Sequence, residues 1–143
     1  MDRNIPLQNR RIGVMINYIA LLMTIVFFEL TKYGIGIPHW AGFILIGVFL
    51  IILILSFIYV YVKSGLWNLT HKKTENLDER EIQVVTQAIR ISYTIFTITV
   101  IVMVYLFAII GLGTIDVVVA ATLLYLAHII PSSILAWTEK EVY

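Results

Sequence analysis

The chain has 143 residues, a length typical of one soluble domain, but its composition excludes an ordinary soluble fold. Apolar residues make up 60% and charged residues only 13%, against about a quarter charged in an average globular chain. The mean hydropathy is +0.93. The net charge of +1 says nothing about nucleic acid, but the ten basic residues are divided among tails and loops, which favours orientation signals over a phosphate-binding face. The lack of cysteine excludes disulfides, thiolate catalysis and cysteine-based metal sites. This is the composition of a chain whose solvent is mostly lipid.

The first apolar run covers residues 12–30 and follows a basic tail that contains Arg3, Arg10 and Arg11. A basic tail before an apolar run is also the pattern of a signal peptide. The run is long for the apolar core of such a peptide, and Lys32 and Tyr33 stand where a small-residue cleavage site would be needed. We therefore expect a retained signal-anchor helix.

A turn is predicted at residues 33–38, which contain two glycines and a proline. His39 and Trp40 follow at the position of an interfacial aromatic belt. The second apolar run, residues 41–62, has no charged residue and is long enough to cross a bilayer. The first two runs therefore predict a helical hairpin.

The polar stretch 63–90 divides the chain into two halves. Its first part, 64–75, is predicted to be an interfacial loop. Asn76 followed by Glu79 has the form of a capping box, so we expect the third helix to begin near Leu77 and run to Ile110. At about 1.5 Å per residue such a helix is about 50 Å long, against a hydrocarbon core of about 30 Å, so its base must extend into the cytoplasm or along the interface.

The fourth run, residues 115–137, is separated from the third by Gly111-Leu112-Gly113. Thr114 is predicted to cap this helix, with Asp116 in its first turn, where a carboxylate favours the positive end of the helix dipole. The two halves share one plan, which either a duplication or two unrelated hairpins would produce.

Basic residues predict the orientation. With four crossings, the two termini and the central stretch lie on one side of the membrane, and they hold nine of the ten Lys and Arg residues; Lys32 alone lies on the other side. We therefore expect both termini in the cytoplasm.

His128 is the most informative single residue, because an ionisable group near the middle of a membrane helix is costly and usually faces the bundle interior. Tyr125 and Ser132 share its helix face and would form a polar stripe with it. One hypothesis is a position for a proton relay, a ligand or a haem, although no second histidine is apparent to pair with it. The other is a neutral imidazole bonded to a neighbouring helix, with Asn17 or Thr24 as its partner.

Other polar residues in the apolar runs favour packing over transport. Asn17 and Thr24 share one face of the first helix, as Ser92 and Thr99 do on the third, and such residues let membrane helices approach closely. Glu29 is expected near the outer end of the first helix, without a second acid at its depth to make a cation site.

The residues Asp78, Glu79, Arg80 and Glu81 allow two interpretations. They are a candidate interaction or metal-assisted site on the cytoplasmic side, because carboxylate oxygens bind hard cations. They are also what a capped and solvated helix start requires. No known catalytic motif occurs in the chain.

The segment from Asn76 to Gln83, followed by Ala88, Ser92 and an apolar helix, resembles the Asp-Glu-Arg signature of small four-helix membrane proteins of bacteria and archaea. That family has no established activity. The resemblance implies a prokaryotic source and four helices, and no mechanism.

These patterns predict an all-α polytopic integral membrane protein, with four transmembrane helices arranged as two hairpins in one domain. We expect a non-enzymatic protein of the plasma membrane that acts by interaction, of an accessory, regulatory or immunity type. The alternative is a small oligomeric transporter or channel that uses His128 and Tyr125. No cofactor or metal is predicted; the expected partners are the lipid bilayer, a membrane or cytoplasmic protein, or further copies of this chain.

Overall fold

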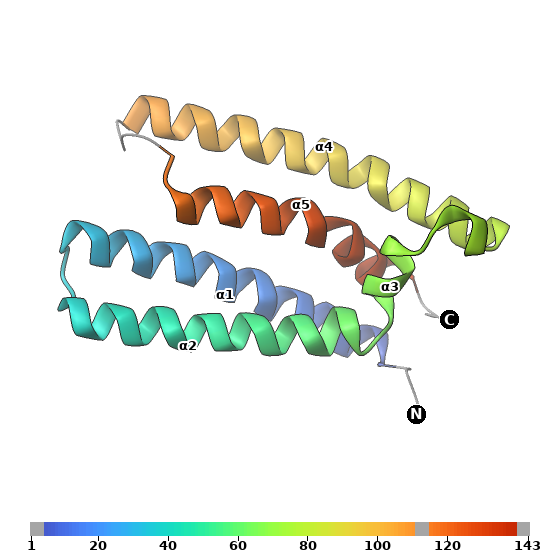
Figure 1. Ribbon diagram of the computed structural model, residues 1–143, viewed down its shortest axis with the longest axis horizontal. Coiled ribbons are helices and arrows are strands. Elements are labelled where there is room, and N and C mark those ends of the chain that lie inside the picture. The colour runs from blue at the N-terminus through green and yellow to red at the C-terminus, as the bar shows by residue number, and fades with distance from the viewer. Residues whose placement is uncertain (1–4, 111–114, 140–143) are drawn as a thin grey trace.

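A computed structural model of the chain describes residues 5–110 and 115–139, and within these ranges the regular structure is entirely helical (Figure 1). Four long helices are joined by turns and one short helix. In chain order the elements are α1 (Leu7–Tyr33), α2 (His39–Phe57), the π-helical turn η1 (Ile58–Val62), α3 (Leu66–His71), the 3-10 turn η2 (Thr74–Asn76), α4 (Glu79–Ile110) and α5 (Val117–Thr138).

The four long helices lie roughly side by side in the order α2, α1, α5, α4 (Figure 1). α1 and α2 form an antiparallel hairpin with the most extensive contact in the fold, and α5 packs between α1 and α4. α4 therefore packs mainly against α5, with a smaller contact to α3. This arrangement leaves most of the surface of α4 outside the bundle.

The α1–α2 hairpin depends on two glycines with different roles, one at the turn and one at the contact between the helices. Gly34 ends α1 with φ 67°, a left-handed conformation in which its neighbour Ile35 returns a backbone hydrogen bond to Leu30 O at 3.0 Å. Gly42 instead permits close approach, because a Cβ atom there would collide with the side chain of Thr31. The predicted turn at 33–38 thus coincides with the break between the two helices.

The first part of the polar stretch is not the loop that the sequence predicts. α3 forms there because its first residue, Leu66, is fully buried and its second, Trp67, packs edge-on against Phe57 with ring centroids 5.2 Å apart. Gly65, with φ 82°, makes the reversal from η1 into this short helix. The packing of Leu66 and Trp67 therefore holds α3 against the bundle, although the composition of this segment is mostly polar.

α4 begins two residues later than predicted. Asn76 ends the 3-10 turn η2 and Leu77 is extended, so neither can start the helix. The capping box is made by Asp78 and Glu81: the amide of Glu81 donates to Asp78 Oδ1 at 2.6 Å, and the amide of Asp78 donates to Glu81 Oε2 at 3.1 Å. The register predicted with Asn76 and Glu79 is wrong, because Asn76 belongs to the 3-10 turn and Asp78 is the residue that caps α4.

α5 is capped by Asp116, whose side chain accepts hydrogen bonds from the amides of Val118 and Val119. The predicted cap, Thr114, and the glycine break before it lie outside the described residues. Pro131 lies within α5, and the helix continues through it to Thr138.

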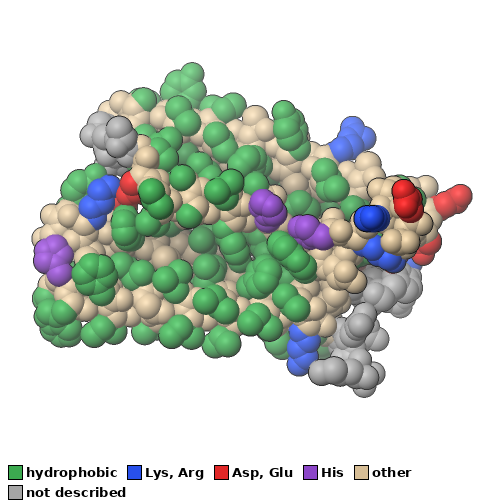
Figure 2. Space-filling view, in the orientation of Figure 1, with side chains coloured by type: hydrophobic (Ala, Val, Ile, Leu, Met, Phe, Trp, Pro, Cys, Tyr) green, Lys and Arg blue, Asp and Glu red, His purple; other side chains and the backbone are tan. Residues whose placement is uncertain are grey.

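The outside of the molecule is more apolar than much of its inside. Large apolar side chains are exposed along all four long helices, and they cover most of the face shown in Figure 2. Several polar side chains are buried instead, among them Asn17, Ser132 and Ser133. Four helices are long and apolar enough to cross a membrane, so the predicted all-α fold with four such helices is confirmed.

Candidate functional site

A buried amide joins three helices near the middle of the bundle. Asn17 on α1 is fully buried, and its Nδ2 donates to Ser56 Oγ at 2.9 Å and to Leu53 O at 3.2 Å, both on α2. Its Oδ1 accepts the hydroxyl hydrogen of Tyr125 on α5 at 2.9 Å. Both donor hydrogens and the acceptor of this amide are therefore used within the protein.

A second polar cluster forms around Ser133 of α5. Its hydroxyl donates to Ile129 O at 2.9 Å, so its oxygen acts as the acceptor for other groups. Tyr18 of α1 donates to it at 3.1 Å, and Tyr61 of η1 lies at 2.8 Å, where it too must donate. One serine thus connects α1, η1 and α5.

The adjacent Ser132 connects α5 to the short helix α3. Its hydroxyl is fully buried and lies 2.9 Å from Thr70 Oγ1. Thr70 Oγ1 also lies 3.0 Å from the carbonyl oxygen of Trp67, and either hydroxyl can be the donor of the bond between Thr70 and Ser132. The three polar clusters share one physical role, which is to fix the rotation of α5 against its neighbours.

His128 does not take the interior position that the sequence predicts. Its side chain is exposed, and its Nδ1 lies 2.9 Å from Leu124 O on its own helix. The predicted partners are engaged elsewhere: Asn17 bonds Tyr125, and Thr24 donates to Ala20 O at 2.8 Å. The prediction that His128 pairs with Asn17 or Thr24 is wrong, because the rotation of α5 turns Tyr125 inward and His128 outward.

His71, for which no role is predicted from sequence, lies beside His128 in the fold. Their ring centroids are 6.5 Å apart and their planes differ by 5°. In sequence, His71 belongs to the polar stretch and shows no relation to an apolar run. Only the return of α3 against α5 brings the two rings together.

The four charged residues at the base of α4 have mainly structural partners. Asp78 and Glu81 form the capping box, and Lys72 Nζ lies 3.5 Å from Glu81 Oε2. Arg80 makes an ion pair at 3.6 Å with Glu139, just beyond the end of α5. Glu79 is exposed and has no ion pair among the described residues. These charged residues therefore determine where α4 begins and how it contacts the end of α5.

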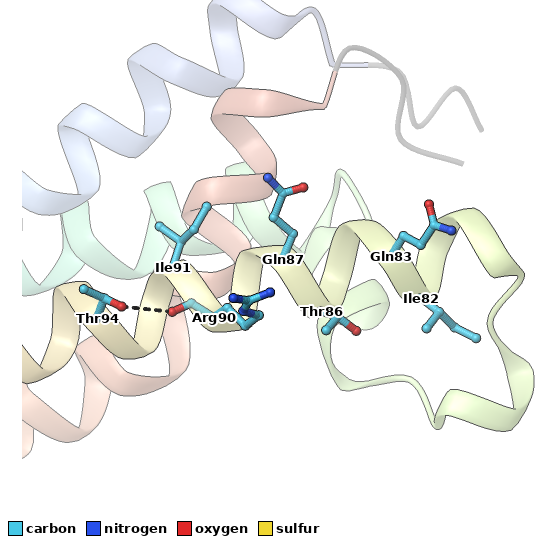
Figure 3. Close-up of a pocket in the computed structure, with 7 residues that line it drawn as sticks. All are labelled: Ile82, Gln83, Thr86, Gln87, Arg90, Ile91 and Thr94. Atoms are coloured by element: carbon cyan, nitrogen blue, oxygen red, sulfur yellow. Dashed lines mark hydrogen bonds between the residues drawn. The ribbon is translucent and has the colours of Figure 1, made fainter.

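Above this base, α4 presents a polar stripe that we define as Gln83, Thr86, Gln87, Arg90 and Thr94. All five residues are exposed, and they line a shallow hollow together with Ile82 and Ile91 (Figure 3). Thr94 bonds the backbone oxygen of Arg90 at 3.3 Å. Within the described parts of the chain, the guanidinium of Arg90 has no ion-pair partner, and the stripe is an exposed polar surface.

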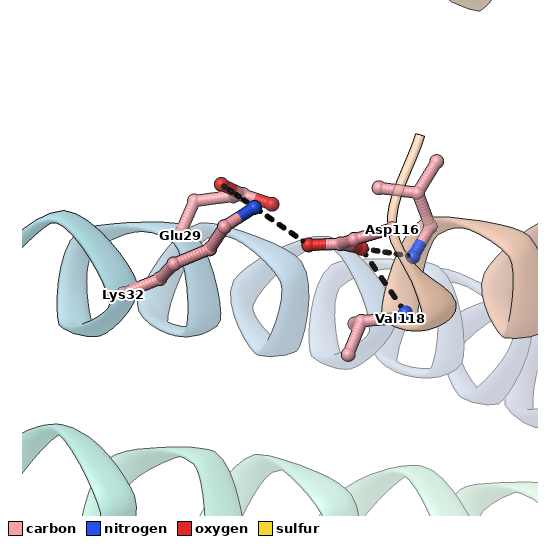
Figure 4. Close-up of polar contacts among 5 residues, drawn as sticks. Glu29, Lys32, Asp116 and Val118 are labelled. Atoms are coloured by element: carbon pink, nitrogen blue, oxygen red, sulfur yellow. Dashed lines mark hydrogen bonds and ion pairs between the residues drawn. The ribbon is translucent and has the colours of Figure 1, made fainter. Parts of the chain in front are cut away.

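An ion cluster lies at the opposite end of the bundle (Figure 4). Lys32 Nζ is 2.9 Å from Asp116 Oδ2 and 3.7 Å from Glu29 Oε2. The ammonium of Lys32, followed by the amides that Asp116 caps, holds the pKa of the Asp116 carboxyl below its usual value. Glu29 therefore does have a second acid nearby, contrary to the prediction. Lys32 lies between the two carboxylates and already provides the positive charge that balances them.

Two arginines of α1 cap the other end of α5. Arg10 Nη2 donates to Glu139 O at 2.6 Å, and Arg11 Nη2 donates to Trp137 O at 2.9 Å. The guanidinium of Arg11 also lies 5.2 Å from the centre of the Trp137 ring. Cations at a helix C-terminus stabilise its unpaired carbonyl groups. The tail predicted as an orientation signal thus also fixes the end of α5.

Across residues 5–110 and 115–139, no three or more His, Asp or Glu side chains gather as a group that could hold a metal ion. The polar side chains described above form hydrogen bonds between helices, which is the usual role of such groups in a membrane bundle. The described geometry therefore offers contacts between helices and exposed polar surfaces.

No family model matches the chain, and no curated protein or solved structure matches it. The fold itself defines the class: a helical protein with four helices compatible with membrane spans. Any activity must be argued from the side chains of this chain.

Proposed function

We propose that this chain is a multi-pass integral membrane protein that acts by contact with a protein partner, in an accessory or regulatory role, and not by catalysis. The observation that carries the proposal is the polar stripe of α4. It combines exposed amides, hydroxyls and one guanidinium on a helix that the bundle covers on one side only.

Membrane insertion is supported by the distribution of apolar surface. In water, exposed isoleucine, leucine, valine and phenylalanine along four helices would drive aggregation. In lipid, exposing the same apolar surface carries no free-energy penalty. Buried hydrogen bonds such as that between Asn17 and Tyr125 are the expected contacts between membrane helices.

The orientation proposed here has both termini in the cytoplasm and the plasma membrane of a prokaryote as the location. Its support is the excess of Lys and Arg at the termini and in the central stretch. In this orientation the capping box and the polar stripe of α4 lie at or inside the cytoplasmic interface. A cytoplasmic protein, or the cytoplasmic part of a membrane protein, can then reach them.

The chemistry of the stripe indicates what such a partner offers. Arg90 favours a carboxylate, because a guanidinium binds carboxylates through paired hydrogen bonds. Gln83 and Gln87, one turn apart, can each donate and accept hydrogen bonds. We therefore propose an acidic, hydrogen-bonding helix or loop as the contacting element.

The test is co-purification from membranes after chemical cross-linking. Replacing Gln83, Gln87 and Arg90 by alanine should remove a cross-linked partner that wild type retains, because these side chains are exposed and available to a partner. A matched control replaces Gln8, Lys63 and Asn68, which are also polar and exposed but do not belong to α4. Retention of the same partner by the stripe variant, or its equal loss in the control, would contradict the proposal.

A small transporter that uses His128 and Tyr125 is the alternative function. The geometry supports it less well, because Tyr125 gives its hydroxyl hydrogen to Asn17, whereas His128 is directed away from the bundle. Polar groups that are hydrogen-bonded to one another form a packing contact between helices and do not line a water-filled transport pathway.

A further inference from the structure

The pair His71 and His128 has features that the proposed partner surface does not use. The two rings come from different helices, α3 and α5, and are nearly parallel, with centroids 6.5 Å apart. Both side chains are exposed. Figure 2 shows two histidine side chains side by side, where the apolar body meets the charged end of the molecule.

In both rings Nδ1 lies within hydrogen-bond distance of a backbone carbonyl of the same helix. His71 Nδ1 lies 2.9 Å from Trp67 O, and His128 Nδ1 lies 2.9 Å from Leu124 O. A carbonyl oxygen only accepts, so each of these two bonds forms when the ring carries its hydrogen on Nδ1. At His71 the hydroxyl of Thr70 also lies 3.0 Å from Nδ1. Both rings then present Nε2 with an available lone pair.

This arrangement matches the way histidines are prepared for metal binding. A metal-binding histidine usually donates its other ring N–H to a carboxylate or a backbone carbonyl, which sets its tautomer and orientation. Here two neighbouring histidines do so independently. Neutral imidazole nitrogen is a ligand for Zn²⁺, Ni²⁺ and Cu²⁺, whereas Mg²⁺ and Ca²⁺ prefer oxygen.

The distance between the rings is suitable for a shared ion. With metal–nitrogen bonds of about 2.0–2.1 Å, two imidazoles on one ion have their centroids about 5–6 Å apart. The observed 6.5 Å is larger by about 0.5–1.5 Å, which rotation of two exposed side chains can close.

The backbone on either side of the pair is already held in place. Trp67 stacks on His71 with centroids 4.0 Å apart, and Thr70 is bonded to Ser132 at 2.9 Å, which ties α3 to α5. An ion would therefore bind between two fixed helices. Binding would not first have to order a flexible loop, so little of its free energy is lost.

We propose that His71 and His128 form a binding site for one divalent transition-metal ion of the Zn²⁺, Ni²⁺ and Cu²⁺ class, coordinated through the two Nε2 atoms. The bound ion bridges α3 and α5 just before the chain enters α4. The site is independent of the polar stripe, since neither histidine belongs to it.

Trp67 provides a direct optical test, because Ni²⁺ bound at His71 lies close to the indole and quenches its fluorescence. The experiment uses the full chain in detergent without a polyhistidine tag, with Trp40 and Trp137 replaced by phenylalanine so that Trp67 is the only tryptophan. Saturable quenching at one Ni²⁺ per chain is expected. His71→Ala and His128→Ala should each weaken the affinity on the order of tenfold or more, since even partners behind a metal ligand contribute about 10–100-fold.

His39 is the matched control, because it is the third histidine of the chain and is also exposed. His39→Ala should leave the affinity unchanged. An unchanged affinity in His128→Ala, or an equal loss in His39→Ala, would overturn the proposal. Equilibrium dialysis of the tag-free wild type with Zn²⁺ or Ni²⁺ gives a measurement that needs no tryptophan substitution. Less than half an ion per chain at saturation would also overturn it.

Discussion

The hydroxyl of Tyr125 donates a hydrogen bond to the side-chain oxygen of Asn17 at 2.9 Å, between residues 108 positions apart. The same amide donates to Ser56 and to Leu53 O, so one buried residue joins α1, α2 and α5. This relationship assigns to Tyr125 the inward position that the sequence suggested for His128.

Asn17→Ala should destabilise the fold by about 1–3 kcal/mol, because it leaves buried partners on two helices unsatisfied. Thr24→Ala should cost less, since Thr24 bonds only a carbonyl of its own helix. Unfolding of the detergent-solubilised protein measures both. In a double-mutant cycle, Asn17→Ala and Tyr125→Phe should be non-additive. Strictly additive costs would mean that the bond between them contributes nothing.

Gly42→Ala should separate α1 from α2 and cost about 1–3 kcal/mol, because the added Cβ meets the side chain of Thr31. Gly47 of the same helix is the matched control, since a Cβ there has nothing within 4 Å. Gly47→Ala should be neutral or stabilising by up to about 1 kcal/mol, the gain in helix propensity. Equal effects in thermal unfolding would contradict the close α1–α2 contact.

The carboxyl of Asp116 should make stability depend on pH in the acidic range. Because its pKa in the folded protein is lower than the ordinary 3.8, its contribution is complete above that value and is lost as pH falls through the lower folded pKa. Asp116→Asn keeps a good helix cap but removes the ion pair with Lys32, so its acid unfolding profile should be flatter than that of wild type. The test is to measure the unfolding midpoints of wild type and Asp116→Asn between neutral and strongly acidic pH. Identical profiles would show that the ion pair of Asp116 with Lys32 does not cause the pH dependence of stability.

The capping box at the start of α4 predicts unequal effects within the charged signature. Asp78→Ala should cost about 0.5–2 kcal/mol and speed hydrogen exchange at the amides of the first turn. Glu79→Ala should change exchange little, because its side chain caps nothing. If Asn76→Ala were as harmful as Asp78→Ala, the register with Asp78 as the cap would be contradicted.

The proposed topology can be tested with single cysteines, because the natural chain has none. A cysteine at position 35, an exposed residue of the α1–α2 turn, should react with an impermeant maleimide added to intact cells. A cysteine at position 72 should react only after permeabilisation. The opposite pattern would reverse the orientation, and labelling of both in intact cells would argue against a four-span insertion.

The features that the sequence predicted well are local ones. The apolar runs at 12–30 and 41–62 correspond to α1 and to α2 with η1, because the length and hydropathy of a run belong to consecutive residues. The same holds for the turn at 33–38, since glycine and proline act on their own backbone. The register of the capping box was wrong by two residues because a 3-10 turn competes for Asn76.

The pairings across helices were decided only by the tertiary structure. His71 lies beside His128, Lys32 between Glu29 and Asp116, and two tyrosines around Ser133, because each helix has one particular rotation about its axis. That rotation depends on close contacts such as Gly42 against Thr31 and on buried bonds such as Asn17 to Tyr125. Composition and periodicity by themselves determined which segments are helices of membrane length. They did not determine which side of α5 faces inward, because nearly all of its faces are apolar enough for either environment.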